Sequence, residues 1–427
     1  MELTKKKLDY KWVIVAVCFM MEFVCLGFCS SNKGLYLGAI ANANFNGNRF
    51  LLSFNDTIRF TVSSGINFFF GALILKFGAR KMTAFGFITL IASILCYAYA
   101  DNLVVFYIGG ALLGLGLAFT TTAMVSFIVR NWVTENTGSV LGFVLASNGL
   151  GGALAAQIVT PIIASGTFGY RNAYKLVALI LVVVGTLSVI FLRDKPKNST
   201  VANPPKAKKK PRGGGWIGME YKDAIKRPYF ILSCIIIFLT GLMLSGINGV
   251  ASTMLKDDIG LDPGFVATVM TVHSLALMLF KFLAGVIYDR KGLRWMLTIC
   301  EVAAIAVYVC LALVTNSPTG MVLAMVWGIF SSLALPMETI GVSLFTSDLY
   351  GNRSFEKMLG LMMALNHLGY AVGSPVMNLS WELSGGSYVP VIWAGAGLMA
   401  VVLVLNQFLI SAAHKDRKAI EASAQNP

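Results

Sequence analysis

The chain has 427 residues, of which 56% are hydrophobic and only 13% are charged. This composition excludes a soluble globular protein of that length and indicates an integral membrane protein. The 34 Lys and Arg residues outnumber the 20 Asp and Glu residues, but in a membrane protein this excess indicates contact with anionic lipid, and we expect no nucleic-acid partner.

Apolar runs of about 20 residues, the length that crosses a bilayer as a helix, recur along the whole chain. Backbone polar groups in lipid must be satisfied internally, so we expect each run to be an α-helix and the fold to be all-α. Twelve runs are predicted: 12–41, 50–75, 82–100, 103–129, 137–164, 171–192, 229–255, 264–288, 295–315, 318–346, 358–381 and 388–412. The first is too long, and too interrupted by Glu22, to be a simple signal peptide.

A basic segment rich in Pro and Gly separates the sixth run from the seventh and is typical of a flexible linker. It predicts four parts: an N-terminal six-helix bundle at 1–192, a linker at 193–227, a C-terminal six-helix bundle at 228–414 and a tail at 415–427. Lys and Arg concentrate in the linker, in the tails and in alternate loops. This bias predicts a multi-pass protein of the plasma (inner) membrane with both termini in the cytoplasm.

The two halves are internal repeats. The stretch 71–81, after the second run, corresponds to 285–294, after the eighth run. The stretch 142–151 in the fifth run corresponds to 360–369 in the eleventh, at nearly the same offset in the numbering. Two motifs that recur in the same order and in register indicate duplication of a six-helix unit.

The loop after the eighth run has the pattern Gly-x-x-x-Asp-Arg-x-Gly-x-Arg, complete at Gly285, Asp289, Arg290, Gly292 and Arg294. With the repeated halves, this pattern resembles the major facilitator superfamily over the whole chain. The resemblance implies two six-helix bundles around a central cavity that opens to alternate sides of the membrane. It also implies that Asp289, Arg290 and Arg294 form an inner-side gate, although they could simply set the topology. The first copy of the loop departs from the pattern, because Leu75 replaces the aspartate.

Ionisable residues inside membrane-spanning runs are costly and are therefore functional candidates. Lys281 lies well inside the eighth run, and its repeat counterpart is the neutral Asn67, so the scaffold does not require this charge. Lysine supplies a point charge for a carboxylate in a desolvated cavity. We expect Lys281 and Asn67 to contribute to a substrate site; the alternative for Lys281 is an interhelical pair with a carboxylate.

Glu22 and Lys33 lie eleven residues apart in the first run, about three helical turns and about 16 Å along one face. Lys33 is a second candidate for the substrate site, or it ends the helix and extends to the membrane surface. Glu22 is a candidate for proton coupling, as is Glu338 in the tenth run, which could equally be structural.

Further candidates for the substrate site are polar residues of the fifth, eighth and eleventh runs: Asn148, His273, Asn366 and His367. Either histidine could move protons near neutral pH or could be a hydrogen-bonded packing residue. Glu301 in the ninth run is expected to be structural. Asp56 and Arg59, near the start of the second run, are spaced as a local ion pair. The seven cysteines all fall in apolar runs without metal-ligand spacing, so we expect no metal site, no cofactor and no catalytic residue.

A narrower resemblance is to monocarboxylate transporters and oxalate:formate antiporters, which have a basic residue just before the Asp-Arg loop, where Lys281 lies. Lys33 falls near a lysine that monocarboxylate transporters have in the first span. The resemblance implies a monomeric secondary transporter for small carboxylates that works by proton symport or anion exchange. The alternative is a proton-driven efflux carrier for amphipathic compounds, which would depend on Glu22 or Glu338; a non-transporting receptor is a third possibility.

Overall fold

The computed structural model describes residues 10–31, 36, 39–40, 43–44, 49–194, 216 and 218–423, and its regular structure there is entirely helical. The N-terminal half contains α1 (Tyr10–Cys25), α3 (Arg49–Phe77), α4 (Ala79–Ala98), α5 (Leu103–Thr120), α6 (Thr122–Trp132), α7 (Thr137–Ile163) and α8 (Gly169–Phe191). Helices α5 and α6 together correspond to one predicted run, divided at Thr121.

The C-terminal half follows the short helix α9 (Tyr221–Ala224). It contains α10 (Pro228–Thr253) with the short π-helix η1 (Met254–Asp258), α11 (Pro263–Lys291), α12 (Leu293–Ala312), α13 (Pro318–Ala334), the short 3₁₀-helix η2 (Leu335–Glu338), α14 (Ile340–Tyr350), α15 (Phe355–Leu383) and α16 (Val389–Ser423). Helix α13, η2 and α14 together correspond to the tenth run, interrupted near Pro336 because proline cannot continue the hydrogen-bond ladder.

Ten helical segments of the described chain are long and apolar enough to cross a membrane. With α1 and α15, which pack among them, they make up the two six-helix halves. Large apolar side chains such as Phe69, Ile88 and Phe408 are exposed on the outside of the bundle. In water so much exposed apolar surface would be unstable, whereas in a bilayer it faces lipid.

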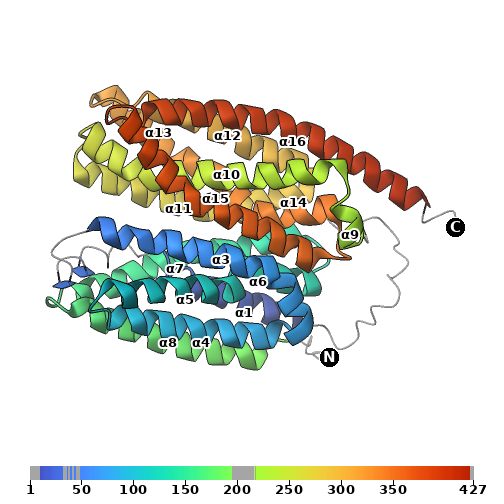
Figure 1. Cartoon of the computed structure of the whole chain (residues 1–427), viewed down its shortest axis with the longest axis horizontal. Helices are drawn as coiled ribbons and strands as arrows, with labels where there is room; N and C mark the ends of the chain where they lie inside the picture. The colour runs from blue at the N-terminus through green and yellow to red at the C-terminus, as the bar shows by residue number, and fades with distance from the viewer. Residues whose placement is uncertain are drawn as a thin grey trace, which may run out of the picture.

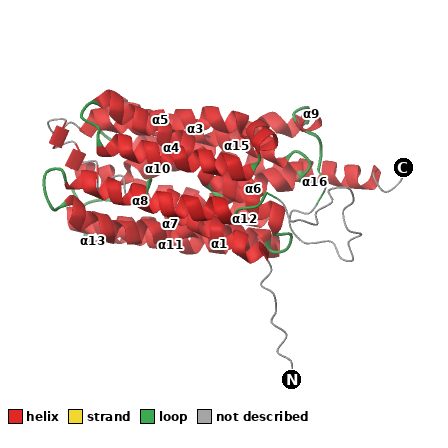
Figure 2. Cartoon of the chain, turned by 90° about the horizontal axis from the view of Figure 1, so that it is seen from below, coloured by secondary structure: helices red, strands yellow, loops and turns green. Residues whose placement is uncertain are grey.

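The helices of the two halves form two stacked bundles (Figure 1). Helices α10 to α16 lie above α1 to α8 in that view, and the turned view shows the long helices running nearly parallel (Figure 2). Helix α1 begins, and α16 ends, at the same end of the molecule, which we name the terminal end. The opposite end is the distal end.

The turns after α3 and α11 confirm the repeat. Gly78 and Gly292, which occupy matching positions of the two repeats, have φ of 81° and 88°. That conformation disfavours residues with a side chain, so each position favours glycine. Both turns lie at the terminal end.

Glycines let the halves approach each other closely along two helix pairs, α3–α15 and α7–α11. A Cβ atom on Gly142 of α7 would lie 2.7 Å from the Lys281 carbonyl oxygen of α11. In the other pair, a Cβ on Gly360 of α15 would lie 2.6 Å from the Asn67 carbonyl oxygen of α3. These are matching positions of the two repeats, so the crossings are pseudo-symmetric; small residues permit this close packing in membranes.

The halves are sealed against each other at the terminal end. A Cβ on Gly285 would lie 2.1 Å from the Gly138 carbonyl oxygen, and one on Gly71 would lie 2.6 Å from Lys357 Cα. Helices α6 and α14, which are the terminal-end parts of their spans, also contact each other across the halves. The structure therefore represents a state closed at the terminal end.

The first predicted run is wrong as one continuous helix. Helix α1 ends at Cys25, and residues 26–31 form turns in which the Ser31 N–H bonds to the Leu26 carbonyl, five residues back. This pairing departs from the α-helical ladder, so the predicted face from Glu22 towards Lys33 does not continue as a regular helix. Lys33 itself lies outside the described residues.

Replacing Gly285 by Ala should lower the thermal unfolding midpoint of the purified protein. Its added methyl group meets a backbone carbonyl, and overpacking of this kind costs about 1–3 kcal/mol. Gly65→Ala is the matched control, because Gly65 also lies in a helix but has open space around its Cβ position. Equal midpoints for the two variants would contradict the tight contact between α7 and α11.

Candidate functional site

A cavity of about 140 Å³ lies between the halves. Its walls come from Leu26, just after α1, and from α3, α5 and α6 of one half, and from η2 and α15 of the other. Its polar lining residues are Arg59, Ser63, Asn67, Thr121, Thr122, Glu338, Thr339, His367 and Tyr370. A polar cavity at the junction of two repeats in a helical membrane protein is the candidate for a ligand site.

Arg59 brings a positive charge to this cavity. Its side chain is buried, and its guanidinium stacks over the Phe60 ring with Cζ 4.2 Å from the ring centroid. Nη1 donates to Ser30 Oγ at 2.9 Å and lies 3.9 Å from Asp56 Oδ1. The local pairing of Asp56 with Arg59 expected from their spacing is therefore present, but it is long, and Arg59 also lines the cavity.

His367 connects the two halves at the cavity wall. Its Nδ1 lies 2.8 Å from Ser63 Oγ and accepts a bond of 3.1 Å from Asn67 Nδ2. Asn67 also donates to the Ser63 carbonyl, while its own Oδ1 has no partner in the described part of the chain. Both candidates, Asn67 and His367, thus lie at the cavity, and Asn67 has an unused acceptor there.

Glu338 is the carboxylate of the cavity wall. It is buried, and Oε2 accepts a short hydrogen bond from Asn366 Nδ2. Tyr370, which also lines the cavity, interacts with both Glu338 and Arg59 and so lies near both charges. Asn366 does not line the cavity; it holds Glu338 from within the C-terminal half.

Lys281 lies beside this cavity and forms a bridge between the halves. Its Nζ donates to Asn148 Oδ1 of α7 at 3.0 Å, and its charge attracts Glu22 of α1. Thr122, a cavity residue, donates to Glu22 Oε1 at 3.1 Å, so Glu22 lies directly behind the wall. Lys281 is only 3% exposed and does not line the cavity itself.

His273 and Glu301 lie within the C-terminal half, away from the cavity. His273 Nδ1 contacts Ser331 Oγ at 2.9 Å, and its ring stacks on Trp327 at a centroid distance of 5.8 Å. Glu301 accepts a short hydrogen bond from Asn406 of α16. These contacts are those of packing residues, the alternative considered for His273 and the expectation for Glu301.

Asp289 joins α11 to the N-terminus of α7. Its two carboxylate oxygens accept from the backbone N–H groups of Gly138, at 2.9 Å, and Ser139, at 2.6 Å. A carboxylate at a helix N-terminus satisfies unpaired donors and complements the helix dipole. Arg294 instead donates to Ser411 of α16 within its own half, and Arg290 is exposed.

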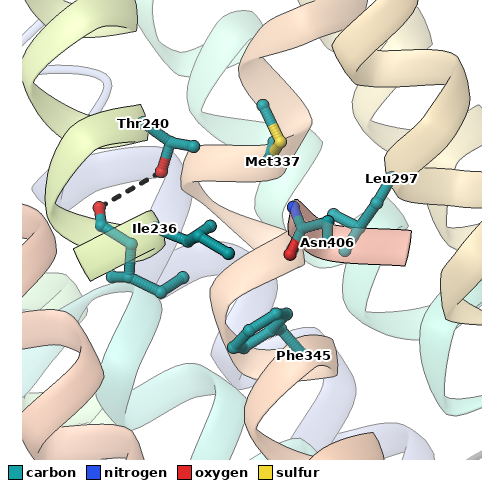
Figure 3. Close-up of a pocket in the computed structure, with 8 residues that line it drawn as sticks. Ile236, Thr240, Leu297, Met337, Phe345 and Asn406 are labelled. Atoms are coloured by element: carbon teal, nitrogen blue, oxygen red, sulfur yellow. Dashed lines mark hydrogen bonds between the residues drawn. The ribbon is translucent and has the colours of Figure 1, made fainter. Parts of the chain in front are cut away.

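Two other hollows do not suit a polar substrate. The one in Figure 3 lies inside the C-terminal half, among Thr240, Met337 and Asn406, and holds about 10 Å³, enough for about one water molecule. The other, of about 260 Å³, lies between α1 and α8 and is lined almost wholly by apolar side chains. The cavity between the halves remains the candidate site.

Sequence reasoning treated Arg59 only as a partner of Asp56. A signal was available, because Arg59 and His273 occupy matching positions of the two repeats, in the register that pairs Asn67 with Lys281. Two ionisable residues at equivalent positions of the two repeats indicate that the fold places polar side chains at this depth in the membrane. Which of them faces the cavity depends on their neighbours, which the sequence did not reveal.

Two repeated six-helix halves with a polar cavity between them define a membrane transporter of the alternating-access type. The chain matches the Major Facilitator Superfamily at residues 23–244 and 233–427 and belongs to that family. It is therefore an integral, multi-pass membrane transporter and not an enzyme.

Individual relatives are distant. The chain is 21% identical over 336 residues to multidrug resistance protein 2 of Bacillus subtilis (strain 168), covering 77% of this chain and 78% of that protein. It is 24% identical over 346 residues to monocarboxylate transporter 13 of Bos taurus, covering 79% of this chain and 76% of that protein. The solved structure of the transporter FucP in the outward conformation superposes with a TM-score of 0.71 at 15% identity, covering 94% of this chain and 99% of that one. This last likeness supports the fold.

Replacing Asp289 by Asn should open the seal at the terminal end in a larger share of molecules, because the amide keeps an acceptor but loses the charge that the α7 N-terminus favours. Distances between spin labels on the terminal ends of α7 and α11 would measure this population. Asp262→Asn is the matched control, because the Asp262 carboxylate caps the N-terminus of its own helix, α11, and this contact does not connect the two halves. Unchanged distances in Asp289→Asn would show that the aspartate does not hold the seal.

Proposed function

We propose that the protein is a secondary active transporter for small organic monocarboxylates, coupled to protons. The supporting observation is the buried Lys281 beside the central cavity, whose Nζ donates to Asn148 across the halves and whose charge attracts Glu22. We further propose that the termini are cytoplasmic, that the protein acts as a monomer in the plasma membrane, and that the state closed at the terminal end is outward-facing. The relative named as a monocarboxylate transporter supports this choice of substrate.

Charge balance supports proton coupling. A buried ammonium needs a compensating anion, and in this state the Lys281 ammonium attracts the Glu22 carboxylate across the halves. If a substrate carboxylate takes that place, Glu22 must lose its charge by binding a proton to keep the region neutral. Its Oε2 is buried with no hydrogen-bond partner among the described residues, so it has room for that proton. One carboxylate and one proton would then be loaded together.

Glu338 supports a substrate with a single carboxylate. It shares a cavity of about 140 Å³ with Arg59, so a second carboxylate on the substrate would lie close to a buried negative group. Like charges at short range in a medium of low dielectric repel strongly. The small volume, below the range of about 300–1,000 Å³ for sites that hold drug-sized ligands, also favours small acids.

Proton-driven efflux of amphipathic compounds is the second candidate. Two buried carboxylates, Glu22 and Glu338, adjoin or line the cavity, and one relative is named as a multidrug resistance protein. That function depends on the carboxylates and not on Lys281. The two candidates are therefore separated by the effect of removing the lysine.

Replacing Lys281 by Gln should abolish carboxylate counterflow in proteoliposomes. Removing one partner of a buried charged pair costs about 2–5 kcal/mol, which corresponds to about 30-fold to several thousand-fold in affinity. Lys281→Arg should retain part of the activity, and Lys175→Gln, which removes an exposed lysine, is the control. Parent-like carboxylate transport by folded Lys281→Gln protein would favour the efflux candidate.

Replacing Glu22 by Gln should separate transport from protons. The amide mimics the protonated acid, so we expect exchange of internal for external carboxylate to persist while a proton gradient no longer drives accumulation. Both rates can be measured in the same proteoliposomes with a radiolabelled acid. Glu301→Gln is the control, because Glu301 is a buried glutamate held within one half. Gradient-driven accumulation at the parent's level in Glu22→Gln would exclude Glu22 as the coupling residue.

A further inference from the structure

We propose that Arg59 is a second binding site for the substrate carboxylate, on the distal side of Lys281; this inference rests on the proposed carboxylate transport. The residue is 9% exposed and lines the cavity, and its Nε is buried without a hydrogen-bond partner in the described part of the chain. An unpaired buried donor on a charged group is costly unless a ligand supplies the acceptor.

The contacts of Arg59 leave one side of its guanidinium available. Nη1 is held by Ser30, and Asp56 at 3.9 Å is too distant for a hydrogen bond. The Phe60 ring fixes the plane of the guanidinium from one face. Nε has no hydrogen bond among the described residues, and with Nη2 it forms the planar pair of donors that binds a carboxylate with two parallel bonds.

The repeat places Arg59 and Lys281 at different depths. Helices α3 and α11 end at the matching residues Phe77 and Lys291. Arg59 precedes the end of its helix by about five helical turns, whereas Lys281 precedes the end of its helix by about three. Arg59 therefore lies about two turns, or about 12 Å, nearer the distal end. With the terminal end sealed, a substrate that enters from the distal end reaches Arg59 before the level of Lys281.

The corresponding position in the other half shows that the scaffold does not require this charge. His273 occupies it, and its ring is satisfied by Ser331 and Trp327 inside its own half. Arg59 instead points into the space between the halves, where Ser63, His367 and Tyr370 also lie. A charge that the matching position of the other half lacks, next to hydrogen-bonding groups of both halves, is suited to a ligand.

The test measures the affinity of the purified full-length parent protein, and of its Arg59→Gln variant, for small carboxylic acids. The probes are a series of monocarboxylates from formate to benzoate and, for the acid that the parent binds most tightly, its uncharged amide. We expect Arg59→Gln to bind that acid at least about 30-fold more weakly, with binding of the amide unchanged. Arg171→Gln, which removes an arginine paired with Asp101 near the distal end, should bind the acid as the parent does.

Arg59→Lys provides a second measurement if the glutamine variant does not fold. It keeps the positive charge but not the planar fork, so we expect affinity between those of the parent and Arg59→Gln. Parent-like affinity for the acid in Arg59→Lys and in any folded Arg59→Gln protein overturns the assignment of Arg59 and leaves the proposed transport intact. Failure of the parent to bind any of the acids would instead refute the proposed function itself.

Discussion

Close contact between two pairs of helices, α3–α15 and α7–α11, is the constraint on which the rest of the structure depends. Glycines at matching repeat positions bring the backbones together there. The polar groups on these helices and on α1 that interact across the halves include Asn67, His367, Asn148, Lys281, Asp289 and Glu22. Because a bilayer supplies no water to satisfy these groups, they need partners within the protein, and here the opposite half provides several of them. The crossings therefore determine both the seal and the position of the site.

Whether a buried charge interacts with its own half or with the opposite half distinguishes a structural charge from a functional one. Glu301 is as buried as Glu22, but its partner Asn406 belongs to the same half and moves with it. The attraction between Glu22 and Lys281 extends between the halves, so its energy changes when the halves rock against each other. Only an interaction that differs between two states can shift the balance between them. Burial alone would not have distinguished these two glutamates.

Much of the fold could be predicted from the sequence, because long apolar runs and the internal repeat report directly on helices in lipid and on duplication. The alignment of the repeats also predicted that Asn67 and Lys281 are equivalent residues. In the structure each lies where its helix crosses a helix of the other half, next to Gly360 and Gly142 respectively. The orientation of each helix about its own axis could not be predicted in this way. Arg59 and His273 have equivalent positions, yet one faces the cavity and the other faces α13, because Ser331 and Trp327 provide partners only for His273. The end of α1 at Cys25 could not be predicted either, because the sequence around it is apolar and contains no residue that clearly ends a helix.

The helix pairs α3–α15 and α7–α11 differ in the charges that they carry. This asymmetry bears on how the transporter could change between its two conformations. At α3–α15 the hydrogen bonds join Ser63, Asn67 and His367, and the position equivalent to Asp289 is the exposed Leu75. At α7–α11, Asp289 binds the α7 N-terminus while Lys281, on the same helix, binds Asn148. Helix α11 thus carries both the charge that seals the terminal end and the charge proposed to bind substrate. A rigid helix transmits displacement along its length, so a change of partner at Lys281 would act directly on the contact of Asp289.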